Sequence, residues 1–260
     1  MTVLPFAGRH AVVTGGGTGL GRATALALAE QGAATVIVTG RRAEPLREVA
    51  AAHPAIRPVV ADVRTGGGAQ AVAHAVDSGP GHLDVLVHNA GVWRSTPLQQ
   101  IEEAAVEEIL DTNVTGPILL TARLLPYLAE QSAVVLVSSV MGHLPGPGQC
   151  VYAASKAALD SLTRSWASEL APRRIRVNAV APGSVETESL IATARAAGWS
   201  EEKIEQVRAR KGRTFPLGRY GRPEDVTVWI TQLAAPASSW VTGQVITMDG
   251  GWDLLSAPAV

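Results

Sequence analysis

Eight residues, Thr14-Gly15-Gly16-Gly17-Thr18-Gly19-Leu20-Gly21, decide the fold that this sequence predicts. They lie between a short apolar run at 11–14 and an alanine-rich helical pattern at 20–31. Glycines let a backbone turn tightly and approach a ligand closely, and the start of the following helix stabilises a negatively charged group. A glycine-rich turn after a first strand therefore indicates nucleotide binding, with a plain tight turn as the alternative.

Short β-branched runs alternate with longer helical patterns along the rest of the chain. The other predicted strands cover residues 35–38, 56–60, 83–87, 134–139, 175–180 and 244–248. The other predicted helices cover residues 44–52, 69–76, 101–112, 116–130, 152–170, 201–211 and 224–234. Such alternation implies right-handed crossovers, and hence an α/β fold with a doubly wound parallel sheet of about seven strands and helices on both faces.

The alternation continues to the end of the sequence without an internal repeat or a linker. We therefore expect a single domain over residues 1–260. The segment 184–217 is the least regular part of the chain, and we expect it to form a lid over the substrate.

Composition narrows the classes of function. The chain has 22 Lys+Arg and 23 Asp+Glu in 260 residues, a net charge of −1, which argues against nucleic acid as a partner. No apolar run approaches the ~18 residues of a membrane span. The single cysteine, Cys150, cannot form an intrachain disulfide and favours a reducing, cytoplasmic location. No metal site is predicted.

The end of the second predicted strand bears on the kind of dinucleotide. About 20 residues after such a turn, an acid would bind the 2′-hydroxyl of NAD, whereas an arginine suits the 2′-phosphate of NADP. This sequence has Gly40-Arg41-Arg42 at that place. It therefore predicts NADP(H) as the preferred cofactor and NAD(H) as the alternative. The alternative explanation of the two arginines is a solvated start to the next helix.

A second stretch, Ser139 to Lys156, indicates proton chemistry. Tyr152 and Lys156 are four residues apart at the start of a predicted helix, so they lie one turn apart on one face. A neighbouring ammonium favours the phenolate, and we expect it to lower the pKa of Tyr152 from its usual value of about 10. Ser139 closes a predicted strand and offers a hydroxyl. Taken alone, such a Tyr/Lys pair is more often a surface feature.

With these motifs in this order, the sequence resembles the short-chain dehydrogenase/reductase family over nearly its whole length, in the branch of about 250 residues with TGxxxGxG and YxxxK motifs. The turn at Thr14, the Ser139 to Tyr152 spacing of thirteen residues and the Tyr152-x-x-x-Lys156 pair carry the resemblance. Further matching motifs are Asp62-Val63, His88-Asn89-Ala90-Gly91, Asn113 and Pro182-Gly183-Ser184-Val185-Glu186-Thr187. The fold implied is of the Rossmann type.

The resemblance implies an oxidoreductase that transfers a hydride between a nicotinamide and a ketone or secondary alcohol. Tyr152 would be the general acid/base, and Lys156 would lower its pKa and hold the nicotinamide ribose. Ser139 would hydrogen-bond the substrate oxygen, and Asn113 would position a water in a proton relay. These four are the predicted catalytic residues.

The predicted cofactor-binding residues follow from the same motifs. They are Gly15, Gly17, Thr18, Gly19, Leu20, Gly21, Arg41, Arg42, Asp62, Val63, Asn89, Ala90, Gly91, Tyr152, Lys156, Pro182, Gly183, Val185 and Thr187. Two positions depart from the family pattern. His88 replaces an asparagine, and we expect it to pack under the cofactor turn. Thr18 stands where many NADPH-using relatives have a basic residue, so the NADP prediction rests on Arg41 and Arg42.

Substrate contacts are predicted for residues in loops near the tetrad and in the lid, with packing or exposure as the alternative for each. They are Trp93, His143, Cys150 and Trp199. The resemblance also implies a homotetramer. Two other functions stay open: a non-catalytic cofactor-binding sensor, and non-redox chemistry such as epimerisation or dehydration. A sensor needs the turn but not the proton relay, so the complete tetrad argues against it.

Overall fold

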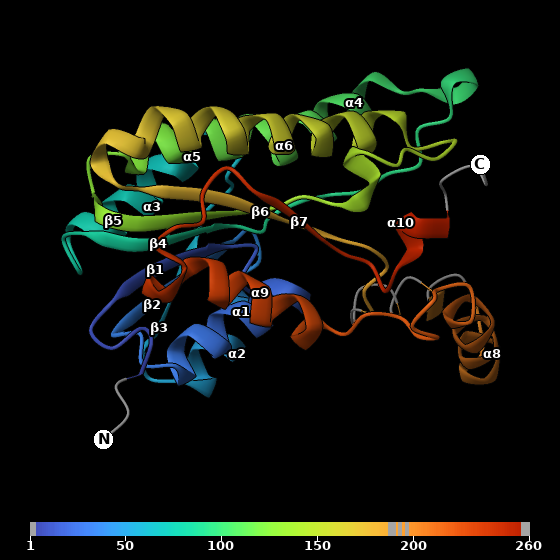
Figure 1. Cartoon of the computed structure of the whole chain (residues 1–260), viewed down its shortest axis with the longest axis horizontal. Helices are drawn as coiled ribbons and strands as arrows, with labels where there is room; N and C mark the ends of the chain where they lie inside the picture. Colours follow the sequence, from blue (N-terminus) through green and yellow to red (C-terminus); the bar gives the residue numbers. More distant parts are fainter. Residues whose placement is uncertain (1–3, 187–190, 192–193, 196–197, 256–260) are drawn as a thin grey trace.

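The computed structural model describes residues 4–186, 191, 194–195 and 198–255, and its centre is one seven-stranded parallel sheet (Figure 1). The strand order is β3-β2-β1-β4-β5-β6-β7. The strands are β1 (His10–Thr14), β2 (Thr35–Gly40), β3 (Ile56–Val60), β4 (Leu83–His88), β5 (Leu128–Val137), β6 (Arg176–Pro182) and β7 (Val245–Met248). The predicted fold class is confirmed.

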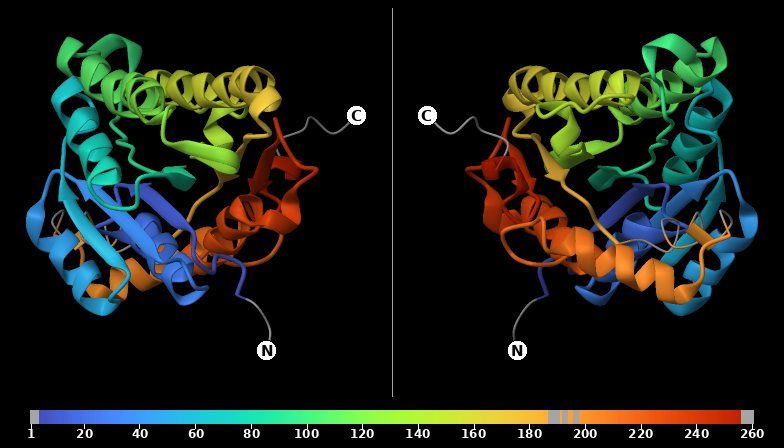
Figure 2. Two further views of the ribbon diagram at one scale, coloured as in Figure 1. Left: turned by 90° about the vertical axis from the view of Figure 1, so that its left-hand side faces the viewer. Right: turned by 90° about the vertical axis from the view of Figure 1, so that its right-hand side faces the viewer.

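Helices cover both faces of this sheet (Figure 2). The α-helices are α1 (Gly19–Glu30), α2 (Ala43–Ala52), α3 (Gly66–Asp77), α4 (Glu103–Leu110), α5 (Gly116–Leu124), α6 (Cys150–Leu170), α8 (Glu201–Gly212), α9 (Pro223–Ala234) and α10 (Trp252–Leu255). Shorter helical turns are η1 (Leu98–Gln100), the π-helical η2 (Asp111–Thr115), η3 (Val140–Gly142), η4 (Ala171–Arg173) and η5 (Pro236–Ser238). Within the described ranges, none of these helices is both long and apolar enough to cross a membrane.

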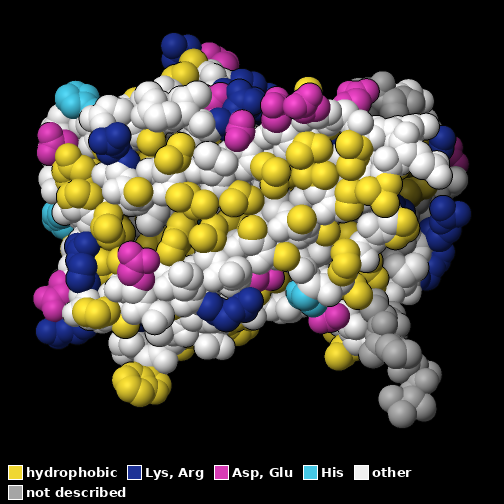
Figure 3. All heavy atoms as spheres, turned by 90° about the horizontal axis from the view of Figure 1, so that it is seen from above, with side chains coloured by type: hydrophobic (Ala, Val, Ile, Leu, Met, Phe, Trp, Pro, Cys, Tyr) yellow, Lys and Arg dark blue, Asp and Glu magenta, His cyan; other side chains and the backbone are white. Residues whose placement is uncertain are grey.

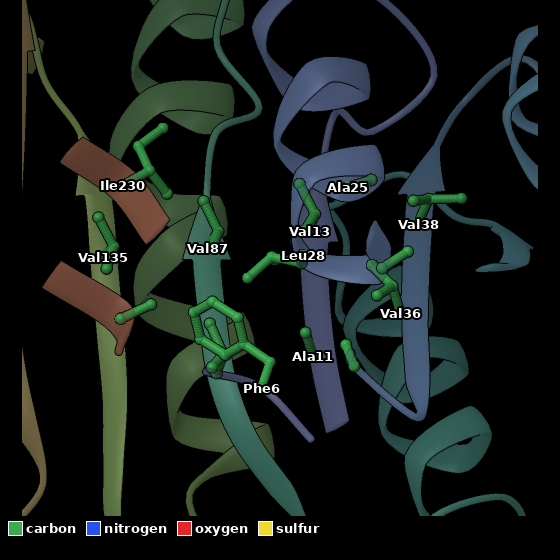
Figure 4. Packing of buried hydrophobic residues seen from close by; sticks show 14 of the residues in the cluster. Phe6, Ala11, Val13, Ala25, Leu28, Val36, Val38, Val87, Val135 and Ile230 are labelled. Carbon is green, nitrogen blue, oxygen red and sulfur yellow. The ribbon is translucent and has the colours of Figure 1, made fainter. Parts of the chain in front are cut away.

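Alternate residues of each strand supply two separate hydrophobic cores. Val13 of β1 packs with Leu28 of α1 and Ile230 of α9 on one face (Figure 4). Its neighbour Val12 packs on the other face, with side chains of α3, α5 and α6 such as Leu120. Because both faces are buried, the strands are continuous apolar runs instead of alternating ones.

The order of the strands locates the ligand site. β1 lies between β2 and β4, so the chain crosses to opposite sides of the sheet from this point. In open α/β sheets, ligands bind outside the carboxyl ends of the strands where the order reverses. The glycine-rich turn after β1 and the Asn89 turn after β4 both lie at this place.

One predicted element is wrong. The helix expected over 116–130 ends at Leu124, and β5 begins at Leu128. Pro126 lies between them, and proline lacks the N–H and clashes with the helical carbonyl four residues earlier. β5 is consequently longer at its start than the predicted strand, and it ends two residues before Ser139.

Candidate active site

The glycine-rich turn forms a cradle that side chains would fill. Gly15 and Gly19 have φ of +63° and +52°, the left-handed region that favours glycine. A Cβ on Gly21 would lie 2.3 Å from the carbonyl oxygen of Gly15, and a Cβ on Gly15 would lie 3.0 Å from the Ala90 backbone. The first turn of α1 thus passes directly against the strand ends, as a pyrophosphate site requires.

A cavity of about 420 Å³ opens over this turn. Its lining comprises Gly15, Gly17, Thr18, Gly19, Gly40, Arg41, Arg42, Pro45, Leu46, Ala61, Asp62, Val63, Asn89, Ala90, Gly91, Val92 and Thr112. Most of the predicted cofactor residues are therefore brought together, and the space and donors fit the adenosine half of a dinucleotide. A larger groove of about 780 Å³ lies between α1 and α9, and none of the four predicted catalytic residues is among the described residues that line either space.

Thr14 and Asn89 fasten the two turns of this cradle to each other. The Thr14 hydroxyl accepts the backbone N–H of Asn89 at 3.0 Å and of Ala90 at 2.9 Å. The Asn89 amide donates in return to the carbonyl oxygens of Thr14, at 2.9 Å, and Gly15, at 3.3 Å. Asn89 thus positions the cradle. Thr14 was not among the predicted site residues, although it begins the motif quoted above.

The two arginines after β2 are exposed at the edge of the cavity. Neither Arg41 nor Arg42 has a hydrogen-bond or ion-pair partner among the described residues. The neighbouring carboxylate, Asp62, is occupied by Arg64, with 2.6 Å between Arg64 Nη2 and Asp62 Oδ2. The hydrogen bonds of Arg64 hold the pKa of Asp62 below its usual value. The charge of Arg41 also acts on Asp62, but neither arginine side chain is hydrogen-bonded among the described residues, so both can donate to an anionic group.

The four predicted catalytic residues come from three parts of the chain. Asn113 lies in η2, Ser139 follows β5, and Tyr152 and Lys156 are on α6. Lys156 Nζ lies 5.5 Å from the centre of the Tyr152 ring. A Cβ on Gly91, which lines the cavity, would lie 3.4 Å from Asn113 Oδ1 and 3.5 Å from Lys156 Nζ. The structure therefore assembles this tetrad at the inner end of the cradle.

Burial alters both titratable groups of the tetrad. Burial lowers the pKa of Lys156 to about 8, opposed by the charge of Asp160. Burial raises the pKa of Tyr152, opposed by a hydrogen bond with Ser139. The expected lowering of the tyrosine pKa by lysine is thus wrong for the protein alone, because removing the phenolate from water outweighs the distant ammonium. Lys156 Nζ instead donates to the Val137 carbonyl oxygen at 2.8 Å.

Ser139 and Asn113 are held by protein groups. Ser139 Oγ accepts the N–H of Met141 at 3.2 Å and donates to the Pro182 carbonyl oxygen at 3.4 Å. Asn113 is buried, and its Oδ1 accepts the backbone N–H of Val92 at 2.8 Å. Its Nδ2 donates to the Val92 carbonyl oxygen and to Ser155 Oγ, both at 3.0 Å. A π-helical turn carries Asn113, a common feature of functional sites.

The motif after β6 lies beside the C-terminal strand. Gly183 N donates to the Met248 carbonyl oxygen at 2.9 Å, and a Cβ on Gly183 would lie 2.7 Å from the Asp249 side chain. Val185 pairs with Gly221 in an isolated bridge. Thr187, the last member of the predicted motif, lies outside the described residues.

The predicted substrate contacts are partly brought together. Trp93 donates to Gln149 at 3.3 Å, and the exposed Cys150 donates to the Thr96 carbonyl oxygen at 3.3 Å, so both line the start of α6. His143 follows η3, and its Nε2 lies 3.2 Å from Oδ2 of Asp253 on α10. Trp199 stands apart, with its ring 4.6 Å from Lys203 Nζ on α8.

His88 points away from the cofactor turn. Its Nε2 lies 2.7 Å from the Thr121 hydroxyl of α5, and its ring lies 6.1 Å from that of Trp166 on α6. Complete burial lowers its pKa to about 3, so the ring is neutral at pH 7. The expectation that it packs under the turn is wrong, because its side of β4 faces α5 and α6.

Fold and site together define a dinucleotide-binding protein of the Rossmann type, and comparisons with known proteins narrow the class. A family model described as enoyl-(acyl carrier protein) reductase, of the short-chain type, matches residues 15–253. The chain is 38% identical over 249 residues to the 3-oxoacyl-[acyl-carrier-protein] reductase FabG of Thermotoga maritima, covering 94% of this chain and 97% of that protein.

Two further comparisons indicate the same family. The cis-4-hydroxycyclohexanecarboxylate dehydrogenase of Sinomonas cyclohexanicum is 39% identical over 255 residues, covering 95% of this chain and 97% of that protein. A solved short-chain dehydrogenase/reductase from Brucella melitensis, described as glucose/ribitol dehydrogenase, superimposes with a TM-score of 0.85 at 30% identity, covering 96% and 99% of the two chains. The chain belongs to the short-chain dehydrogenase/reductase family of oxidoreductases, and this membership implies a nicotinamide cofactor.

Proposed function

We propose that this protein is an NADP(H)-dependent oxidoreductase that interconverts a ketone and a secondary alcohol, with Tyr152 as acid/base. One observation carries the proposal: Asn113 and Lys156 lie beside Gly91 at the inner end of the dinucleotide cradle, with Tyr152 next to Lys156 and Ser139 next to Tyr152. When bound, the nicotinamide would supply a hydride to the carbonyl carbon or accept one from the alcohol carbon.

The protein's own residues would handle the proton and the oxygen. Tyr152 would donate its proton to the carbonyl oxygen during reduction and take it back during oxidation. The pKa raised by burial keeps Tyr152 protonated at neutral pH, which suits the acid role. Ser139, whose hydroxyl donates to the Pro182 carbonyl oxygen in the free protein, would turn to donate to the same substrate oxygen and stabilise its developing charge.

Lys156 and Asn113 would support Tyr152 and Ser139. Lys156, whose Nζ lies 5.5 Å from the centre of the Tyr152 ring, would hold the nicotinamide ribose. Asn113 joins the turn at Val92 to α6 through Ser155, and would position a water between Lys156 and solvent.

We also propose that the chain forms a single domain, in which the segment 184–217, which includes α8, covers the substrate.

Tyr152→Phe tests the mechanism, because it removes the proton and leaves the ring. We expect turnover to fall by about 10²–10⁴-fold, measured as NADPH absorbance with a panel of ketones. Tyr127→Phe is the matched control, since Tyr127 directly precedes β5, at the amino end of a strand whose carboxyl end leads to Ser139. Undiminished turnover in Tyr152→Phe would rule out the assigned role.

The free arginines support NADP(H) over NAD(H), because a 2′-phosphate would find two unpaired guanidinium groups. The test is Gly40→Asp combined with Arg41→Ala. A Cβ on Gly40 would meet its nearest neighbour, Leu46 Cδ2, at 3.8 Å, so the new side chain fits. The double variant should turn the preference in kcat/KM toward NAD(H), whereas a wild type that already prefers NAD(H) contradicts the proposal.

The names of two relatives bear on the substrate class. One reduces a 3-oxoacyl group and the other oxidises a hydroxycyclohexane ring, so both names describe a carbonyl/secondary-alcohol pair. The sensor and the epimerase or dehydratase stay alternatives. Tight NADPH binding without turnover of any carbonyl would favour the sensor.

We further propose a homotetramer. Hydrophobic side chains gather on the face that α4, α5 and α6 form (Figure 3), among them the exposed Leu110, Ile118 and Leu119. A second exposed group, Trp229 and Trp240, lies on α9 and just before β7. Light scattering that shows a stable monomer would contradict this. A cytoplasmic location stays a prediction from the single cysteine.

A further inference from the structure

Asp62 lines the dinucleotide cavity, and its carboxylate is already engaged by a cation. Arg64 Nε donates to both carboxylate oxygens at 3.0 Å, and Arg64 Nη2 donates to Asp62 Oδ2 at 2.6 Å. The backbone N–H of Arg64 also donates to Oδ1, at 3.1 Å. A guanidinium that meets both oxygens of a carboxylate binds more strongly, and with a better defined geometry, than a single contact would.

The backbone of Asp62 is fixed as well. The N–H and the hydroxyl of Thr65 both donate to the Asp62 carbonyl oxygen at 3.1 Å. The start of α3 approaches so closely that a Cβ on Gly68 would lie 1.9 Å from the same oxygen. The turn between β3 and α3 therefore holds Asp62 and Arg64 in one arrangement.

Asp62 is also the neighbour of Arg41 across two adjacent strands. The N–H of Ala61 donates to the Gly40 carbonyl oxygen at 3.0 Å, so Arg41 and Asp62 each come one residue after this contact. Neighbouring strands lie ~4.8 Å apart, and both residues line the same cavity. The charge of Arg41 accordingly contributes to the low pKa of Asp62.

An unoccupied carboxylate at this place would work against an anionic ligand. It would repel a 2′-phosphate, and it would compete for the guanidinium group that the phosphate needs. Arg64 opposes both effects, because it neutralises the charge of Asp62 and occupies both of its oxygens. Arg64 itself is not among the described residues that line the cavity.

We propose that Arg64 is a positioning residue that favours NADP(H): it holds the carboxylate of Asp62 and thereby leaves Arg41 available to the 2′-phosphate. The two arginines after β2 are then not sufficient for the preference, because the carboxylate beside them must also be neutralised. This inference rests on the proposed preference for NADP(H).

The test compares two fragments of the cofactor that differ only in the 2′-phosphate, adenosine 2′,5′-bisphosphate and adenosine 5′-monophosphate. Isothermal titration calorimetry gives a Kd for each, and the ratio of the two is the readout. We expect this preference for the 2′-phosphate to fall by about three- to fivefold in Arg64→Gln, as one charge at a partly exposed site allows. A merely structural role would weaken both fragments alike. An unchanged ratio in Arg64→Gln overturns the proposal.

A double-mutant cycle shows whether Arg64 acts through Asp62. In Asp62→Asn there is no carboxylate to neutralise, so adding Arg64→Gln should leave the ratio of Asp62→Asn unchanged. An equal fall in both backgrounds would mean that Arg64 acts on the phosphate directly, and it would overturn the proposal.

Two further variants serve as rescue and control. Arg64→Lys keeps a positive charge beside Asp62 and should keep the ratio near that of the wild type; a fall as large as in Arg64→Gln contradicts the proposal. Arg47→Gln removes the same charge from an exposed ion pair with Glu44 on α2, 3.3 Å between Arg47 Nη1 and Glu44 Oε2, and neither residue lines the cavity. This control should keep the wild-type ratio, and an equal fall there would reduce the effect to overall charge and overturn the proposal.

The same ratios separate this inference from the proposed cofactor preference. A wild type that binds both fragments equally, with a ratio that still falls in Arg64→Gln, contradicts the preference for NADP(H) and supports the role of Arg64. A wild type that prefers the 2′-phosphate, with an unchanged ratio in Arg64→Gln, does the reverse.

Discussion

Replacing His88 by glutamine should make the stability of this protein less sensitive to acid. His88 is completely buried against Thr121 and Trp166, and burial lowers its pKa from 6.5 to about 3. The unfolded chain takes up a proton at this histidine near pH 6.5, whereas the folded chain does not until about pH 3. Stability is therefore full above pH 6.5 and falls as the pH decreases through this window.

The size of the effect follows from the shift. Below pH 6.5 each pH unit costs roughly one and a half kcal/mol, so the loss at pH 4.5 is about 3 kcal/mol. The glutamine of the variant has no proton to gain, although the changed contact with Thr121 should cost ~1–2 kcal/mol at pH 7. The two stability curves should therefore cross between about pH 6 and pH 5, and the variant should be the more stable protein at pH 4.5.

Urea unfolding followed by circular dichroism at pH 7.5, 6, 5 and 4.5, at one protein concentration, measures this difference. Other groups contribute to acid sensitivity, but they contribute equally to wild type and variant and cancel in the comparison. His74→Gln, an exposed position on α3, is the control and should follow the wild-type curve. Parallel curves for wild type and His88→Gln would refute the reasoning.

Three further substitutions test the site. Gly21→Ala places a Cβ 2.3 Å from the Gly15 carbonyl oxygen and should cost about 3 kcal/mol or more in urea unfolding, whereas Gly67→Ala, in open space on α3, should be neutral or stabilising by ~0.5–1 kcal/mol. Asn89→Ala removes the two side-chain bonds to the carbonyl oxygens of Thr14 and Gly15, so we expect ~1–3 kcal/mol less stability and weaker NADPH binding by fluorescence titration; unchanged binding would contradict a positioning role. Alkylation of the exposed Cys150 with a bulky maleimide should block turnover, and Cys150→Ser should be insensitive; full activity of the alkylated protein would place this thiol away from the substrate path.

The parts of the site that were predictable depend on short-range spacing. Tyr152 and Lys156 are four residues apart on a helix, so their common face follows from helix geometry alone. The glycine-rich turn likewise lies within one βα unit. The end of α5 at Leu124 could also have been predicted from Pro126. The helical pattern continues on both sides of this proline, and the predicted helix was therefore too long.

The parts that were not predictable depend on contacts between distant segments. The direction of the Tyr152 pKa is set by burial, which no spacing along the chain reveals. Arg64 occupies Asp62, and η3 closes over Asp160, only once the loops are packed.

The π-helical turn at Asp111–Thr115 has a consequence for which changes of length this protein tolerates. α4, η2 and α5 follow one another without a gap, so the wide turn acts as one extra residue inserted into a continuous helix. Deleting one residue there would close the wide turn into a regular helix, and α5 would keep its face because the wide turn already absorbs the extra residue. The deletion would instead displace Asn113, whose amide group this turn holds against Val92 and Ser155. We therefore expect this segment to keep a constant length during evolution, although it joins two helices as a tolerant loop would.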